Sequence, residues 1–268
     1  QIDFPNQKER ILVEQPTYHR INDLLLAQKL PYETIERTPQ GINLQKLEKI
    51  FKSGKIKFFY TIPRFHYPLG HSYSRQDKEE ILRLAQLYDV YIVEDDYLSD
   101  FDSRRELTFH YLDNSQRVIY IKSFSTSLFP ALRITALLLP PQIQKIFIAY
   151  KSAVDYDSNL IMQKALSLYI DSLMFEKNRL ALLQLQEEEA RKAQTLLEQA
   201  QLPLSSYLTK DGILLDLRSL SSVSALKHSS LPLDFFEQSY LASCPYQYAK
   251  LPYDNLEKNV EKLKDYLK

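Results

Sequence analysis

Short apolar runs alternate with longer amphipathic segments over residues 11–121, and this alternation limits the possible folds more than any other feature. The runs that predict strands are 11–14, 32–37, 57–61, 90–93 and 118–121, and helical spacing marks 19–30, 44–51 and 75–88. Strands separated by helices pair in parallel, and helices must then cover both faces of the sheet. The pattern predicts an α/β fold with a mostly parallel sheet.

The carboxyl ends of these predicted strands carry most of the candidate binding residues. In sheets of this kind, ligands bind beyond the carboxyl ends of the strands. The side chains that stand just past predicted strand ends are Tyr18, Arg64, Asp95, Tyr97 and Thr126. We therefore expect a binding site at this edge of the sheet.

A hydroxyl-rich loop follows the strand predicted at 118–121. It contains Ser123, Ser125, Thr126 and Ser127, and Arg133 comes shortly after it. Hydroxyl and loop N–H groups bind phosphate oxygens, and a guanidinium can bind two oxygens at once. The loop is a candidate anion site, although serine-rich loops are more often simple turns.

Composition excludes several classes of protein. The chain has 268 residues, a net charge of zero and 44% hydrophobic residues, so no overall field attracts it to nucleic acid or acidic lipid. A single cysteine, Cys244, fits a reducing compartment. Without a run long enough to span a bilayer, we expect a cytoplasmic protein with no membrane contact. The five histidines lack metal-ligand spacing, so no metal site is predicted.

Two segments together carry a specific resemblance. They read EDDYLSDF at 94–101 and SFSTSLFPALR at 123–133. They resemble pyridoxal-phosphate (PLP) enzymes of the aspartate aminotransferase type, and more narrowly the aminotransferase-like domain of MocR-type regulators in the GntR superfamily. That group has EDDY-x-S-x-F and then T-F-S-K-S-L-F-P-A-L-R. The resemblance implies PLP fold type I, with a large α/β domain and a smaller α+β C-terminal domain.

The resemblance also implies roles for individual residues. Asp95 would pair with the pyridine nitrogen of the cofactor, and Tyr97 would bond to the ring hydroxyl. The phosphate would be bound by Arg133 together with Ser123 and Ser125. Tyr18 would pack near the ring. The implied cofactor is PLP or a related B6 phosphate.

The sequence departs from the family at the reacting position. Thr126 stands where the family has the lysine that forms the Schiff base, and a hydroxyl cannot replace that amine. Pro245 stands where an arginine grips the substrate carboxylate, and nearby Lys250 lacks the bidentate fork of arginine. Lys122 is the alternative amine, but nothing in the sequence requires it to point inward. We therefore assign no catalytic residue, and expect non-covalent binding without transaminase activity.

Three functional hypotheses follow. The first is an effector-binding and dimerisation domain of a MocR-type regulator, with a small-molecule effector, a homodimer, and DNA contact only through a winged helix upstream of this chain. The second is a PLP-dependent aminotransferase-type enzyme with an atypical base. The third is a degenerate domain kept only for dimerisation, against which the retained Asp95, Tyr97, Ser125 and Arg133 argue. We expect a large domain at 1–155 that lacks its N-terminal part, a helical connection at 156–200 and a small domain at 201–268.

Overall fold

A computed structural model describes residues 3–103, 106–128, 132–155, 158–220 and 222–267 of the chain. Its larger sheet has seven strands in the order β3-β2-β1-β4-β5-β6-β7. Their bounds are β1 Arg10–Gln15, β2 Tyr32–Thr38, β3 Gly41–Ile42, β4 Ile56–Thr61, β5 Tyr91–Asp95, β6 Val118–Ser123 and β7 Thr135–Leu138. The five strands from β2 to β6 in this order are parallel to one another, and β3 and β7 pair antiparallel at the two edges, which confirms the predicted mostly parallel sheet.

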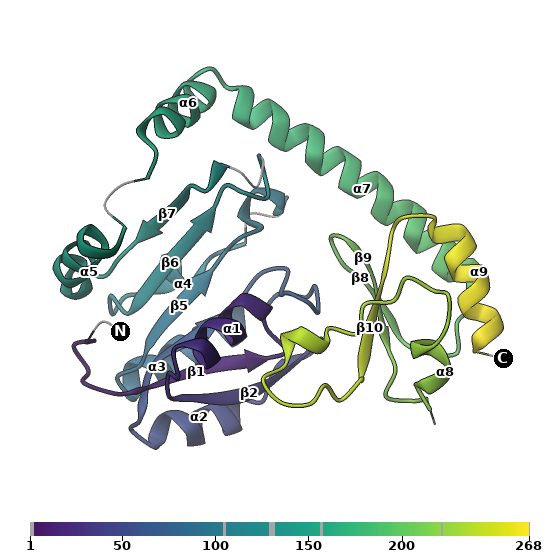
Figure 1. Cartoon of the computed structure of the whole chain (residues 1–268), viewed down its shortest axis with the longest axis horizontal. Coiled ribbons are helices and arrows are strands. Elements are labelled where there is room, and N and C mark those ends of the chain that lie inside the picture. The colour runs from purple at the N-terminus through teal and green to yellow at the C-terminus, as the bar shows by residue number, and fades with distance from the viewer. Residues whose placement is uncertain (1–2, 104–105, 129–131, 156–157, 221, 268) are drawn as a thin grey trace.

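Helices cover both faces of this sheet (Figure 1). They are α1 His19–Ala27, α2 Leu44–Lys52, α3 Arg75–Leu87, α4 Phe109–Leu112 and α5 Pro141–Val154. Successive residues of a strand point to opposite faces, so Leu12 of β1 packs with residues of α2 and α3. Its neighbours Ile11 and Val13 pack with Leu25 of α1. The two-sided burial explains why these strands are short, nearly continuous apolar runs.

The C-terminal part has a separate antiparallel sheet in the order β10-β9-β8. The strands are β8 Ser206–Leu208, β9 Gly212–Asp216 and β10 Tyr248–Pro252, and the helices around them include α8 Ser224–Lys227 and α9 Leu256–Tyr266. α6 (Leu160–Asp171) leads into the long α7 (Met174–Ala200), which runs from the seven-stranded sheet to this smaller unit (Figure 1). The domain limits at 155 and 200 stay a prediction.

A buried ionic cluster fixes the loop after β4, which carries Arg64. Glu14 at the end of β1 lies 3.0 Å from Arg37 Nη1 and accepts hydrogen bonds from Thr61 Oγ1 at 2.9 Å and from the Tyr73 hydroxyl at 2.6 Å. The backbone N–H of Ile62 donates to the same carboxylate at 3.1 Å. These bonds tie the ends of β1, β2 and β4 to the 62–74 loop and so hold this edge of the sheet in place.

None of the helices in the described part of the chain combines the length and the apolar character that a bilayer crossing requires.

Candidate functional site

The three acids at the end of β5 have separate environments. Glu94 is fully buried, and its carboxylate accepts hydrogen bonds from the backbone N–H groups of Phe109 and His110, both at 2.9 Å. Burial raises the pKa of Glu94 to about 7 although these two bonds lower it. Carboxylates stabilise helix N-termini in this way, so Glu94 serves to anchor α4.

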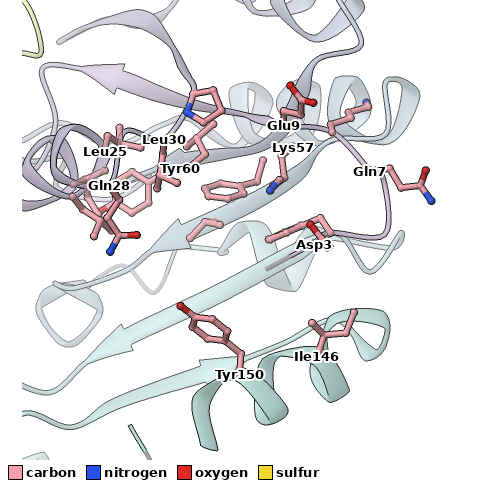
Figure 2. Close-up of a pocket in the computed structure, with 18 of the residues that line it drawn as sticks. Asp3, Gln7, Glu9, Leu25, Gln28, Leu30, Lys57, Tyr60, Ile146 and Tyr150 are labelled. Carbon is pink, nitrogen blue, oxygen red and sulfur yellow. The ribbon is translucent and has the colours of Figure 1, made fainter. Parts of the chain in front are cut away.

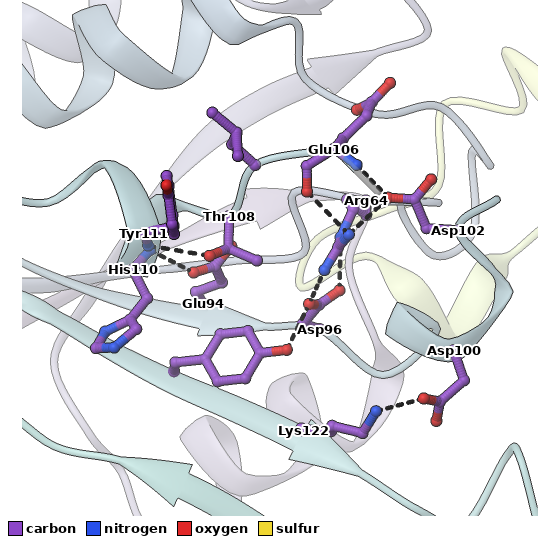
Figure 3. Close-up of polar contacts among 12 residues, drawn as sticks. Arg64, Glu94, Asp96, Asp100, Asp102, Glu106, Thr108, His110, Tyr111 and Lys122 are labelled. Atoms are coloured by element: carbon purple, nitrogen blue, oxygen red, sulfur yellow. Dashed lines mark hydrogen bonds and ion pairs between the residues drawn. The ribbon is translucent and has the colours of Figure 1, made fainter. Parts of the chain in front are cut away.

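Asp96 is paired with Arg64. Arg64 Nε donates to Asp96 Oδ1 at 2.9 Å and Nη2 bonds to Oδ2, while Nη1 donates to Asp102 Oδ2 at 2.7 Å (Figure 3). The Tyr120 hydroxyl also donates to Asp96, at 2.8 Å. Burial lowers the pKa of Arg64, but its bonds to the two carboxylates outweigh burial and raise the pKa above its ordinary value. Arg64 and Asp96 therefore form a buried structural ion pair.

Asp95 lies on the opposite face of the strand from Glu94 and Asp96, because side chains alternate along β5. It is half-buried, and the Tyr60 hydroxyl donates to its Oδ2 at 2.6 Å. Burial raises the pKa of Asp95 to about 6, while the Tyr60 hydrogen bond acts in the opposite direction. Glu94 binds backbone N–H groups and Asp96 binds an arginine. In the described part of the chain, Asp95 has neither kind of partner, so its carboxylate is a candidate for contact with a ligand.

The aromatic residues predicted for the site lie near Asp95, at the edge of the sheet where β5 ends. The Tyr97 hydroxyl donates to the backbone oxygen of Phe65 at 3.1 Å, and burial raises the pKa of Tyr97 far above its ordinary range. Tyr18 is exposed and its ring stands edge-on to Tyr67, with centroids 6.0 Å apart. Two aromatic side chains of the predicted site, Tyr18 and Tyr97, thus stand near the end of β5.

The hydroxyl-rich loop begins where β6 ends. Asp95 and Ile121 are partners in the parallel register, so the loop leaves the same edge of the sheet. Ser125 donates its backbone N–H to Ser123 Oγ at 3.2 Å, and Thr126 and Arg133 are exposed. Arg133 has a left-handed backbone with φ of 52°. Phe129, Pro130 and Ala131 of the predicted motif lie outside the described residues.

The two lysines considered as substitutes are both engaged. Lys122 forms an ion pair with Asp100 (Figure 3), and it points to the face of β6 opposite to that of Ile121. Lys250 Nζ lies 2.5 Å from Asp211 Oδ2. Lys122 therefore points away from the face on which Asp95 lies. The ammonium group of Lys250 is paired with the Asp211 carboxylate.

A large cavity of about 1210 Å³ adjoins this face of the sheet. It lies between α1 and α5, and Tyr60, Val93 and Ile121 contribute to its sheet side, with Ile146 and Tyr150 of α5 across from them (Figure 2). None of the predicted cofactor-binding residues lines it. Tyr60, which the sequence interpretation missed, connects the cavity to Asp95. Its run, IKFFYT, looks like plain core strand, so the sequence gives no local signal for it.

Within the described ranges, no group of three or more His, Cys, Asp or Glu side chains is arranged to hold a metal ion.

Comparison with known proteins defines the relatives of this chain. No protein-family model matches it. It is 46% identical over 177 residues to the uncharacterized HTH-type transcriptional regulator YcxD of Bacillus subtilis, an alignment that covers 66% of this chain and 40% of YcxD. It is 34% identical over 121 residues to the probable rhizopine catabolism regulatory protein MocR of Rhizobium meliloti, covering 44% of this chain and 24% of MocR. The chain thus spans less than half the length of either regulator.

Among solved structures, the kynurenine aminotransferase of Pyrococcus horikoshii superposes with a TM-score of 0.82. The superposition covers 97% of this chain and 69% of the aminotransferase at 24% sequence identity, so it concerns the fold. That protein was solved with PMP. The chain therefore has the fold of the type I PLP-dependent aminotransferases and is related in sequence to MocR/GntR-type HTH transcriptional regulators.

Proposed function

We propose that this chain is the effector-binding part of a MocR-type transcriptional regulator and that it binds PLP or a related B6 phosphate without a covalent bond. The observation that carries this proposal is the separate environment of Asp95. Glu94 caps α4 and Asp96 pairs with Arg64, whereas Asp95 faces the other side of the sheet with Tyr60 as its hydrogen-bond donor. A single carboxylate at a strand end suits one cationic group of a ligand.

The donor set fits a B6 phosphate. A carboxylate with a pKa of about 6 is mostly charged at neutral pH and can pair with a protonated pyridine nitrogen. The hydroxyls of Ser123 and Ser125 and the exposed guanidinium of Arg133 suit phosphate oxygens. Tyr18 and Tyr97 would flank the ring. When bound, such a cofactor supplies an electron sink for bonds at an amine-bearing carbon.

The absence of transaminase activity belongs to the same proposal. Thr126 offers a hydroxyl at the position expected for the lysine, and this side chain is exposed. Lys122 is held by Asp100, which argues against the alternative of an enzyme with an atypical base. The chain would then use the ligand as a signal, and the division of the chain at 155 and 200 would separate the part that binds it from the small domain.

The whole protein is proposed to act as a homodimeric DNA-binding regulator. The relatives YcxD and MocR are described as regulators, YcxD of the HTH type. DNA contact would come from a winged-helix segment outside the 268 residues, because the net charge of this chain is zero and offers no general attraction for phosphates.

Binding of PLP to the full-length protein tests the proposal. We expect saturable binding, and we expect Asp95→Asn to weaken it by at least about tenfold, as loss of a charge-assisted bond requires. Asp254→Asn, a change at an exposed carboxylate outside the candidate site, serves as the control. Calorimetric titration of the three proteins measures the affinities. Equal affinities for all three would remove Asp95 from the site.

The affinity should also depend on pH in a defined direction. The folded-state pKa of Asp95 is raised to about 6, so the carboxyl takes up a proton as the pH falls through 6 and loses its attraction for a cationic ring. We expect binding to weaken between pH 7 and pH 5. Because PLP titrates too, the pH profile of Asp95→Asn must be subtracted. A wild-type profile that parallels the Asp95→Asn profile would contradict the prediction.

A further inference from the structure

We propose that Tyr60 is a positioning residue of the candidate site, which holds Oδ2 of Asp95 and so directs the rest of the carboxylate toward a cationic ligand. The inference rests on the proposed function for the identity of the ligand. The bond between the two side chains is independent of it, and Tyr60 belongs to none of the motifs that the resemblance supplies.

The backbone places these two side chains on one face of the sheet. β4 and β5 are adjacent and parallel, and Tyr60 is the register partner of Val93. Asp95 follows Val93 by two residues and therefore points to the same side. A phenol is long enough to reach one step along the neighbouring strand, and its hydroxyl meets Asp95 Oδ2 at 2.6 Å.

Packing fixes the ring of Tyr60. The side chain is only 4% exposed and belongs to an apolar cluster with Val13, Leu25 and Ile62. Rotation of the ring away from Asp95 would disrupt this cluster, because well-packed interiors resist such changes. Tyr60 therefore presents its hydroxyl from a fixed position, as a positioning residue must.

Toward Asp95 the phenol acts as the hydrogen-bond donor. Burial raises the pKa of Tyr60 well above its ordinary value, and the charge of Asp95 adds to this effect, so the hydroxyl keeps its proton. Asp95 Oδ2 is its acceptor, whereas in the described part of the chain no protein donor bonds to Oδ1. With one oxygen held by the phenol, Oδ1 is the atom available to the ligand. A donor to the charged form of a carboxyl also favours that form.

The charged and titratable groups around the pair come from several elements. Asp96 of the same strand segment raises the pKa of Asp95, after burial and in opposition to the Tyr60 bond. Glu14 of β1 and Tyr18 beside α1 act on Tyr60. None of these neighbours is a cation, so the Tyr60 hydroxyl is the group that stabilises the charge on Asp95 in the described structure.

The experiment is a carboxyl titration of Asp95 without any ligand. The full-length protein is labelled with ¹³C-carboxyl aspartate, the Asp95 signal is assigned with Asp95→Asn, and its midpoint is followed by NMR against pH. In Tyr60→Phe, which keeps the ring and removes the hydroxyl, we expect the midpoint to move above that of the wild type. An unchanged midpoint would overturn the inference.

Tyr88→Phe is the matched control, because the Tyr88 hydroxyl donates to a different carboxylate, that of Glu48, at 3.0 Å. It should leave the Asp95 midpoint in place. If Tyr60→Phe fails to fold, the same hydrogen bond can be tested from the side of its acceptor with Asp95→Asn. In that variant the NMR resonance of Tyr60 Cζ should shift from its wild-type position, and that of Tyr88 Cζ should not. A Tyr60 resonance that does not respond would also overturn the inference.

A second readout connects the pair to the ligand. At pH 7.5 the affinity of Tyr60→Phe for PLP should fall by about tenfold relative to the wild type, the effect expected for a hydrogen bond to a charged group. A wild-type protein that does not bind PLP would remove the proposed function and leave the titration result standing. Wild-type binding with an unshifted Asp95 midpoint in Tyr60→Phe would remove the role of Tyr60 alone.

Discussion

Replacing Arg64 by alanine is expected to lower the free energy of unfolding by about 3–5 kcal/mol, the range found when one partner of a buried ion pair is removed. Arg64 bonds to both Asp96 and Asp102, and all three side chains are at most 7% exposed. The variant would remove the cation that two buried carboxylates share. Chemical denaturation followed by circular dichroism measures the change.

Arg83→Ala provides the comparison. Arg83 also makes a two-pronged contact with a carboxylate, that of Glu80, with bonds of 2.8 Å and 2.7 Å, but both side chains are exposed. Water solvates Glu80 after the substitution, so we expect almost no change in stability. If the two variants lost the same amount, burial would not be the reason for the stability that Arg64 contributes.

Thr126→Lys is expected to create a covalent PLP adduct that borohydride reduction makes permanent. Thr126 is exposed, in the loop that leaves the end of β6, beside the end of β5 where Asp95 lies. A lysine there would bring an amine to the aldehyde of a bound PLP. Intact mass after reduction should change from no adduct in the wild type to about one adduct per chain in the variant.

Thr126→Arg is the control for this experiment, because it adds the positive charge without an amine that can form the bond. It should show no adduct. If Thr126→Lys remained unmodified although the wild type binds PLP, the loop would not lie near the ligand aldehyde, and the correspondence between Thr126 and the family lysine would be wrong.

The parallel core could be predicted from the sequence because a strand that is buried on both faces is a continuous apolar run, and each run can be recognised by itself. The runs at 11–14, 57–61 and 90–93 fall within or overlap β1, β4 and β5. The strands that had no counterpart in the predicted pattern include β3, β8 and β10. They are short, or carry polar residues, or both; β10 contains Lys250 and ends at Pro252, a pattern that an edge strand tolerates and that resembles a loop.

In the candidate site, too, some residues could be predicted from the sequence and others could not. The three acids after the apolar run were visible in the sequence, and the alternation of a strand separates Asp95 from Glu94 and Asp96. The partners of these acids were not visible, because they depend on contacts between distant segments. Arg64 meets Asp102 across 38 residues, and Tyr60 meets Asp95 across 35. The register of β4 and β5 creates the Tyr60–Asp95 contact, the course of two loops creates the Arg64–Asp102 contact, and no local pattern encodes either.

Some assignments from the resemblance stay predictions. Ser123 and Ser125 are joined by one hydrogen bond, and Arg133 is exposed with a left-handed backbone. An exposed arginine after a hydroxyl loop fits a phosphate contact as well as a surface role. Arg133→Ala combined with a PLP titration decides between them, since only a phosphate contact would weaken binding.

Non-covalent binding of a B6 phosphate is best tested by a PLP titration of the wild-type full-length protein, followed by borohydride reduction and intact mass measurement. We expect saturable binding and an unmodified mass after reduction. A covalent adduct on the wild type would contradict this expectation and would direct attention to Lys122 as the amine. Absence of binding would also contradict it, and would favour a domain that serves dimerisation alone.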